Sequence, residues 1–176
     1  MLRYRDGDVA AFEMLYARHR GGLYRYLLRQ LGTPALAEEL YQDVWARIIQ
    51  ARGRYEPRAK FTTWAYRIAH NRLMDHFRAA HVPLAEPDDQ ALEELPDDAP
   101  PAWETMDRER AAHAIASAVA QLPAVQRDAF LMQHEGGMSL EEIAQATGTS
   151  RETVKSRLRY AMARLRERLQ SLKEGT

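Results

Sequence analysis

Residues 61–78 read FTTWAYRIAHNRLMDHFR, and this stretch decides the fold of the first half of the chain. At 3.6 residues per turn it predicts one helix with two unlike faces. The apolar face consists of Phe61, Ala65, Ile68, Ala69, Leu73 and Phe77. The polar face consists of Thr63, Arg67, His70, Asn71 and Arg78, with Trp64 and Tyr66 at its margins. The first face suits a protein core, whereas the second suits phosphates and exposed bases.

A plainer interpretation of residues 61–78 is a solvated helix whose aromatic rings lie in the core. Asp75 favours this interpretation, because an acid at that position can pair with Arg72 or Arg78 on the same helix. The rest of the chain is needed to choose between the two.

Charge is distributed unevenly along the 176 residues, although 25 basic side chains balance 25 acidic ones. Residues 1–80 carry a net charge of +6, residues 81–109 carry −9, and residues 110–176 carry +3. These values indicate two basic modules joined by an acidic connector. Cysteine is absent, which excludes disulfides and thiolate metal sites within the chain. No signal peptide or apolar run of about 18 residues is found, so we expect a cytoplasmic protein without membrane insertion.

A Pro-rich acidic stretch marks the domain boundary. Residues 82–106 are dense in acid and proline and hold few large apolar side chains, a composition typical of an extended or disordered linker. We therefore expect an all-α fold with two small helical domains, residues 1–81 and 107–176, joined by this linker. The linker either mimics nucleic acid in a basic channel or acts as a solubilising tether.

Two more helical regions are predicted in the first domain. Apolar residues recur at helical spacing over residues 6–31, in two segments with a break near Gly21-Gly22. Thr33-Pro34 predicts an N-cap followed by a first turn, and this helix should run to about Gln50. The loop over residues 52–60, RGRYEPRAK, is basic and carries one aromatic ring; it suits an unstacked base but is also typical of ordinary surface.

The helix expected over residues 34–50 carries an acidic and amide patch, formed by Glu38, Glu39, Gln42 and Asp43. DNA would repel these carboxylates. One interpretation is a docking surface for a cationic protein. The other is favourable negative charge near a helix N-terminus.

The second domain contains two helix-start signals close together, after helices predicted over residues 107–121 and 124–134. Ser139 and Glu142 form a capping box for a short helix that closes at Gly148. Thr149 and Glu152 repeat the pattern and start a long helix, giving the dimensions of a helix-turn-helix. The long helix should bury Val154, Leu158, Ala161, Leu165 and Leu169, and should present Arg151, Glu152, Lys155, Ser156 and Arg159 to a major groove.

The order of these motifs resembles that of bacterial sigma factors of the extracytoplasmic-function (ECF) class. The resemblance covers nearly the whole chain, and it is carried by these stretches: Asp6-Gly7-Asp8 with Ala11-Phe12, residues 37–45 (AEELYQDVW), residues 61–71 (FTTWAYRIAHN) with Asp75 and Arg78, Leu122-Pro123 with Gln126-Arg127, residues 141–144 (EEIA), and residues 153–158 (TVKSRL). Ala65 and His70 depart from the family pattern.

The resemblance implies a non-enzymatic specificity subunit for transcription initiation, with no cofactor and no metal. Its partners would be core RNA polymerase, through the beta-prime clamp helices and the beta flap, promoter DNA, and an anti-sigma factor. Glu38, Glu39, Gln42 and Asp43 would bind the polymerase. The minus-ten element would be bound by Arg54, Lys60, Trp64, Arg67, Asn71 and Arg78, and the minus-thirty-five element by Arg151, Glu152, Thr153, Lys155, Ser156 and Arg159.

Two other classes of protein are compatible with parts of this sequence. A free-standing helix-turn-helix regulator would bind duplex DNA specifically without polymerase. A hydrolase or nuclease is disfavoured, because His70 and His76 lie six residues apart, too far around a helix to share a metal.

Overall fold

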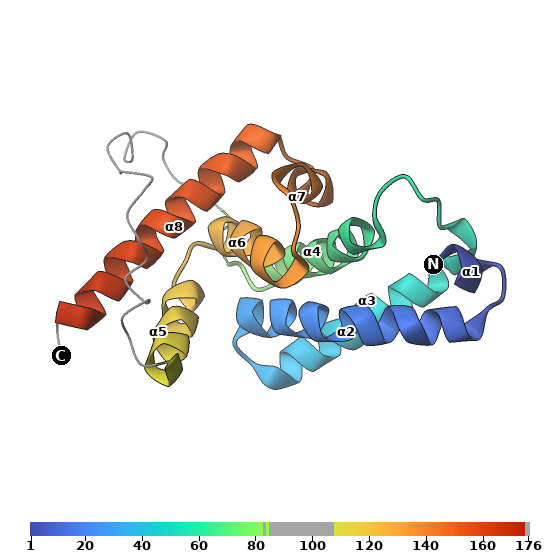
Figure 1. The fold of residues 1–176 in the computed structure, drawn as a ribbon, viewed down its shortest axis with the longest axis horizontal. Helices are drawn as coiled ribbons and strands as arrows, with labels where there is room; N and C mark the ends of the chain where they lie inside the picture. Colours follow the sequence, from blue (N-terminus) through green and yellow to red (C-terminus); the bar gives the residue numbers. More distant parts are fainter. Residues whose placement is uncertain (83, 85–107, 175–176) are drawn as a thin grey trace.

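The computed structural model describes residues 1–82, 84 and 108–174, and these residues form helices and no strands. The first half contains α1 (Leu2–Arg5), α2 (Val9–Leu31), α3 (Pro34–Gln50), the 3-10 helix η1 (Arg52–Arg54) and α4 (Phe61–Ala79) (Figure 1). The second half contains α5 (Arg108–Ala120), α6 (Ala124–Gly136), α7 (Leu140–Thr147) and α8 (Arg151–Glu174). The all-α prediction is confirmed; nearly all of the expected linker, residues 82–106, lies outside the described residues.

The helix starts follow the predicted signals with one shift. Pro34 opens α3 after Thr33, and Ser139 and Glu142 form the expected capping box at α7. The predicted Thr149 cap of α8 is wrong. Ser150 Oγ instead accepts the backbone N–H of Thr153 at 3.0 Å, because α8 begins one residue later than the Thr149 pattern indicates.

The predicted break at Gly21-Gly22 is also wrong, since α2 runs unbroken through both glycines. The chain turns earlier, at Gly7, whose φ of 106° favours glycine. Gly22 has a packing reason instead: a Cβ there would lie 2.9 Å from the carbonyl oxygen of Glu135 on α6. The glycine therefore permits a close approach between the two halves of the chain.

Helix α4 packs against α2 and α3 and buries its predicted apolar face. Ala65, Ala69, Leu73 and Phe77 are buried, and Phe61 and Ile68 are partly buried against them. Thr63 and Tyr66 are corrections to the predicted polar face, because both are only 2% exposed. The polar face is therefore narrower than the wheel indicates; Arg67, Asn71 and Arg78 remain exposed on it.

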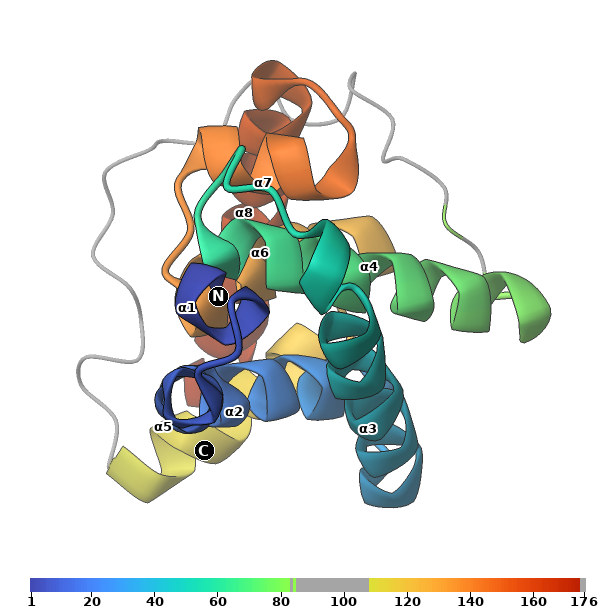
Figure 2. The same cartoon turned by 90° about the vertical axis from the view of Figure 1, so that its right-hand side faces the viewer.

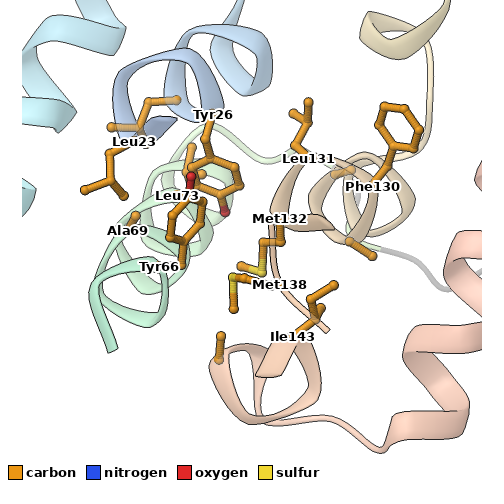
Figure 3. Close-up of a cluster of buried hydrophobic side chains, with 14 of the residues drawn as sticks. Leu23, Tyr26, Tyr66, Ala69, Leu73, Phe130, Leu131, Met132, Met138 and Ile143 are labelled. Carbon is orange, nitrogen blue, oxygen red and sulfur yellow. The ribbon is translucent and has the colours of Figure 1, made fainter. Parts of the chain in front are cut away.

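The two halves of the chain share one hydrophobic core. Helix α6 packs on α2, and α7 packs on α4 (Figure 2). Figure 3 shows Tyr26, Tyr66 and Leu73 of the first half facing Met132 and Met138 of the second. The domains predicted from composition are thus docked on one another in this structure.

Candidate nucleic-acid and protein interfaces

The acidic patch of α3 lies on the outer surface of the helix. Glu38, Glu39 and Gln42 are exposed, and Gln42 Nε2 donates to Glu38 Oε1 at 3.1 Å. The opposite side of α3 buries Leu40, Val44 and Ile48, which fixes the patch toward solvent. The structure therefore brings together three of the four residues as a free surface.

Asp43 differs from its three neighbours in being half-buried and in binding two arginines. Arg72 of α4 donates to its Oδ2, and Arg47 Nε lies 3.3 Å from its Oδ1. Partial burial acts to raise the pKa of Asp43, but the hydrogen bond and charge of Arg72, aided by Arg47, lower it overall. Asp43 thus joins α3 to α4 as well as bordering the acidic patch.

A cationic surface extends from η1 and the loop after it along α4. Arg54, Arg67, Asn71 and Arg78 are exposed, and Arg78 is tied to Asp75 by an ion pair of 2.8 Å. That pair, and a longer one of 3.9 Å between Arg72 and Asp75, agree with the plainer interpretation of residues 61–78 for these two arginines. The other side chains present donors to solvent, as phosphate contacts require.

A pocket of about 240 Å³ lies beside Trp64 at the start of this surface. Its walls are Arg54, Glu56, Arg58, Ala59, Thr63, Trp64, Arg67 and Gln145 of α7. The Tyr55 ring meets Trp64 edge-on, with centroids 4.9 Å apart, and so holds the indole in place. The pocket combines an aromatic wall with guanidinium groups, the chemistry that stacks on a base and binds its phosphate.

Helices α7 and α8 form the predicted helix-turn-helix. Gly148, with φ of 68°, ends α7 and turns the chain into α8. The expected seam of Val154, Leu158, Ala161, Leu165 and Leu169 is buried. Lys155 and Arg159 are exposed and Ser156 is half-buried, so they share the free face of α8 near its N-terminus.

Three of the predicted groove-facing residues also stabilise the turn itself. Arg151 Nε donates to Glu141 Oε1 at 2.5 Å, and its Nη1 donates to Glu152 Oε1 at 3.1 Å. The hydroxyl oxygens Thr153 Oγ1 and Ser150 Oγ lie 2.8 Å apart, within hydrogen-bonding distance. These exposed pairs each contribute little to stability, but together they orient the first turn of α8.

Contacts between the two halves were not predicted from the sequence. Lys60, a predicted DNA-binding residue, is paired with Glu142 of α7 at 2.8 Å. The hydrogen bond from Lys60 is the largest cause that lowers the pKa of Glu142, followed by the backbone of Ser139. His70 Nδ1 lies 2.7 Å from Asp128 Oδ2, so His70 faces α6 rather than solvent. The sequence signal for this contact is Asp128 itself, an acidic residue among the buried positions of α6.

The fold and these surfaces define an all-helical DNA-binding protein with a helix-turn-helix and a second, cationic aromatic surface. Comparison with known families identifies the class further. The profile of Sigma-70 region 2 matches residues 15–81, and that of Sigma-70 region 4 matches residues 112–165. The chain belongs to the ECF RNA polymerase sigma factors, of the sigma-70 family. We refer to α1–α4 as the region 2 half and to α5–α8 as the region 4 half.

Relatives of similar length support the family assignment. The RNA polymerase sigma factor CarQ of Myxococcus xanthus is 35% identical over 98% of this chain and 97% of its own. The ECF RNA polymerase sigma factor RpoE of Cereibacter sphaeroides is 32% identical over 92% of this chain and 88% of its own. Sigma factors are transcription initiation factors. This chain contains two of their regions, region 2 and region 4.

Solved structures support the fold. CnrH, in complex with the cytosolic domain of CnrY, has a TM-score of 0.69 at 24% identity, over 96% of this chain and 94% of that one. The sigma factor RpoE of Bartonella quintana, in complex with the anti-sigma factor NepR, has a TM-score of 0.70 at 21% identity, over 92% and 98%. Within the described residues, no helix combines the length and the apolar character needed to cross a bilayer.

Proposed function

We propose that three surfaces of this sigma factor divide the work of initiation. The acidic patch of α3 binds the clamp helices of core RNA polymerase. The loop after η1 and the exposed face of α4 bind and melt the minus-ten element. The N-terminal face of α8 reads the minus-thirty-five element.

The minus-ten role is supported most directly by the pocket beside Trp64. Melting needs favourable contacts with one exposed strand to offset the lost base pairing and stacking. Trp64 offers an aromatic wall, and Arg54 and Arg67 offer charge beside it. At about 240 Å³ the pocket is smaller than the roughly 300–1,000 Å³ of most small-molecule sites, and it suits a single flipped base. The same surface continues along the exposed DNA strand through Lys60, Asn71 and Arg78.

The minus-thirty-five role is supported by the exposed end of α8. Lys155 and Arg159 are exposed, and the Arg159 guanidinium lies 5.4 Å from the centre of the Tyr160 ring, so both side chains can reach base edges and phosphates. Arg151, Glu152 and Thr153 fix the first turn of the helix, and Ser156 lies half-buried beside Lys155. The beta flap of the polymerase would hold the region 4 half over this element.

We further propose that an anti-sigma factor binds this chain and occludes its polymerase and DNA surfaces. One similar solved structure holds the sigma factor RpoE with the anti-sigma factor NepR, and another holds CnrH with the cytosolic domain of CnrY. The chain itself would perform no catalysis and would act in the cytoplasm.

Paired substitutions test the division between the two DNA surfaces. Arg159→Ala should weaken binding to promoter duplex by about 1–3 kcal/mol, with relaxed preference at one base of the minus-thirty-five element. Arg67→Ala should leave duplex affinity nearly unchanged but slow promoter melting, followed with a fluorescent base in the minus-ten element. Arg164→Ala on α8 and Arg20→Ala on α2, both at exposed positions, are the matched controls. Unchanged duplex affinity in Arg159→Ala would show that the reading face is misassigned.

A further inference from the structure

A second polar pocket, of about 220 Å³, lies where α2, α4 and α6 meet. It shares no residue with the acidic patch, with the pocket beside Trp64 or with the exposed end of α8. Helix α2 supplies two arginines and a histidine to its walls, α4 supplies two hydroxyl side chains, and α6 supplies one glutamate. The pocket is therefore a separate place at which polar groups converge.

The Tyr66 hydroxyl is a donor without a protein partner in this pocket. The residue is 2% exposed, and its Oη makes no hydrogen bond among the described residues. A Cβ at Gly22 would lie 3.2 Å from this oxygen, and one at Gly136 would lie 3.1 Å from Tyr66 Cζ. Both glycines line the pocket, so the phenol end of the ring faces it. Burying a hydroxyl without a partner costs free energy, which a bound acceptor would recover.

The Tyr66 hydroxyl also keeps its proton. Burial, together with the charge of Glu135, raises the pKa of Tyr66 above its ordinary value. The group therefore offers an O–H to a ligand throughout the neutral pH range.

Helix α4 begins beside the same pocket with backbone donors that no side chain caps. Lys60 is the N-cap residue, and its side chain makes no capping hydrogen bond. The N–H groups of the first turn thus lack intrahelical acceptors and form the positive end of a 19-residue helix. Thr62 lies in this first turn and lines the pocket with its side chain. Helix starts of this kind bind phosphate and other oxyanions.

The charges around the pocket favour an anion. Arg18 is exposed and forms no ion pair among the described residues. Arg25 and Arg29 both bind the carboxylate of Glu135, at 2.7 and 3.0 Å, so this acid is neutralised with one positive charge in excess. Burial and the charge of Arg18 lower the pKa of His19, so its ring is neutral at neutral pH and can still donate one N–H.

We propose that this pocket binds a small ligand with a dianionic phosphate group, either inorganic phosphate or a phosphate monoester. Its oxygens accept hydrogen bonds from the Tyr66 hydroxyl, from the first turn of α4 and from Arg18. The pocket is smaller than the roughly 300–1,000 Å³ of most small-molecule sites, which favours a ligand of few atoms. The site is additional to the roles in initiation proposed above and does not depend on them.

Isothermal titration calorimetry of the full chain with inorganic phosphate, at constant ionic strength in potassium chloride, tests the site. We expect saturable binding. Tyr66→Phe should weaken it about tenfold, because a hydrogen bond to a charged acceptor is lost. Arg18→Gln should weaken it about fivefold through the loss of one exposed charge. No saturable binding by the parent would show that the pocket holds only water, and unchanged affinity in Tyr66→Phe would equally overturn the proposal.

Matched controls come from the same helix. Tyr24→Phe removes a hydroxyl and Arg20→Gln removes an exposed charge on α2, both outside the pocket. Each should keep the phosphate affinity of the parent. Weakening by Arg20→Gln equal to that by Arg18→Gln would indicate attraction to net charge alone and would contradict a defined site.

Thermal unfolding separates a lost ligand contact from a damaged fold. Because the Tyr66 hydroxyl has no protein partner, Tyr66→Phe should unfold at the parent's midpoint, or slightly above it, without phosphate. Phosphate should raise the midpoint of the parent and of Tyr24→Phe more than that of Tyr66→Phe. A Tyr66→Phe protein that is less stable without phosphate would show that the hydroxyl serves the fold, and would overturn its assignment to a ligand.

Two methyl esters distinguish a small ligand from the backbone of a nucleic acid. Methyl phosphate is a monoester with a charge of about −1.5 to −2 at neutral pH. Dimethyl phosphate has a single charge and a second substituent, as a nucleic-acid phosphate does. Methyl phosphate should displace inorganic phosphate from the protein, and dimethyl phosphate should not. Equal displacement by both would identify a contact for a nucleic-acid backbone and would overturn the proposed ligand class.

Discussion

Glu39 and Asp43 border the same patch on α3 but differ in their surroundings. Glu39 is exposed, whereas Asp43 is held by Arg72 and Arg47. A substitution at Asp43 therefore disturbs the contact between α3 and α4 together with any polymerase contact. Glu39 is the cleaner position at which to test the docking surface.

Charge reversal in Glu39→Lys should weaken binding to core RNA polymerase about fivefold, the equivalent of roughly 1 kcal/mol for an exposed charge. Thermal stability should be almost unchanged, because the side chain lies at the surface. Glu13→Lys, an exposed charge reversal on α2, is the control for net charge. Equal weakening by both variants, measured by fluorescence anisotropy, would contradict a specific role for the α3 patch.

Single residues also show where helical periodicity reaches its limit. The wheel placed Thr63 and Tyr66 on or beside the polar face of α4, yet both are buried. Tyr66 lies against Gly136 of α6, and Thr63 lines a pocket together with Gln145 of α7. One helix considered alone does not show that a second domain covers part of its polar side.

At the scale of elements, α7 links the helix-turn-helix to the region 2 half. Its capping box satisfies two orphan backbone donors, with Ser139 Oγ accepting from Glu142 N at 3.2 Å and Glu142 Oε2 accepting from Ser139 N at 2.9 Å. The other carboxylate oxygen of Glu142 binds Lys60. The same glutamate thus starts the helix and contacts Lys60 of the proposed minus-ten surface.

Ser139→Ala should lower the free energy of unfolding by about 1 kcal/mol, because the cap of α7 loses its side-chain acceptor. Urea denaturation followed by circular dichroism measures this loss through the midpoint at constant slope. Ser117→Ala, in the body of α5, should be neutral or slightly stabilising. A Ser139→Ala protein as stable as the parent would contradict the importance of this cap.

At the scale of the whole molecule, local signals predicted the elements and the family resemblance but not their docking. Caps, glycines and apolar spacing gave the starts of α3, α4 and α7 because these features act within a few residues. Asp128 interacts with Tyr26, Gln30 and His70, which lie 58 to 102 positions away in the sequence. No local sequence pattern predicts pairs so far apart. The Gly21-Gly22 pair predicts a helix break, but Gly22 instead makes room for the backbone of Glu135 on α6.

We expect this chain to direct core RNA polymerase to promoters through two DNA-binding surfaces. Run-off transcription from a genomic promoter library, with and without the purified protein, tests it most directly. We expect protein-dependent transcripts whose templates share one pair of upstream elements at minus ten and minus thirty-five. Specific duplex binding by the protein alone, without any protein-dependent initiation, would contradict the claim and would indicate a free-standing helix-turn-helix regulator.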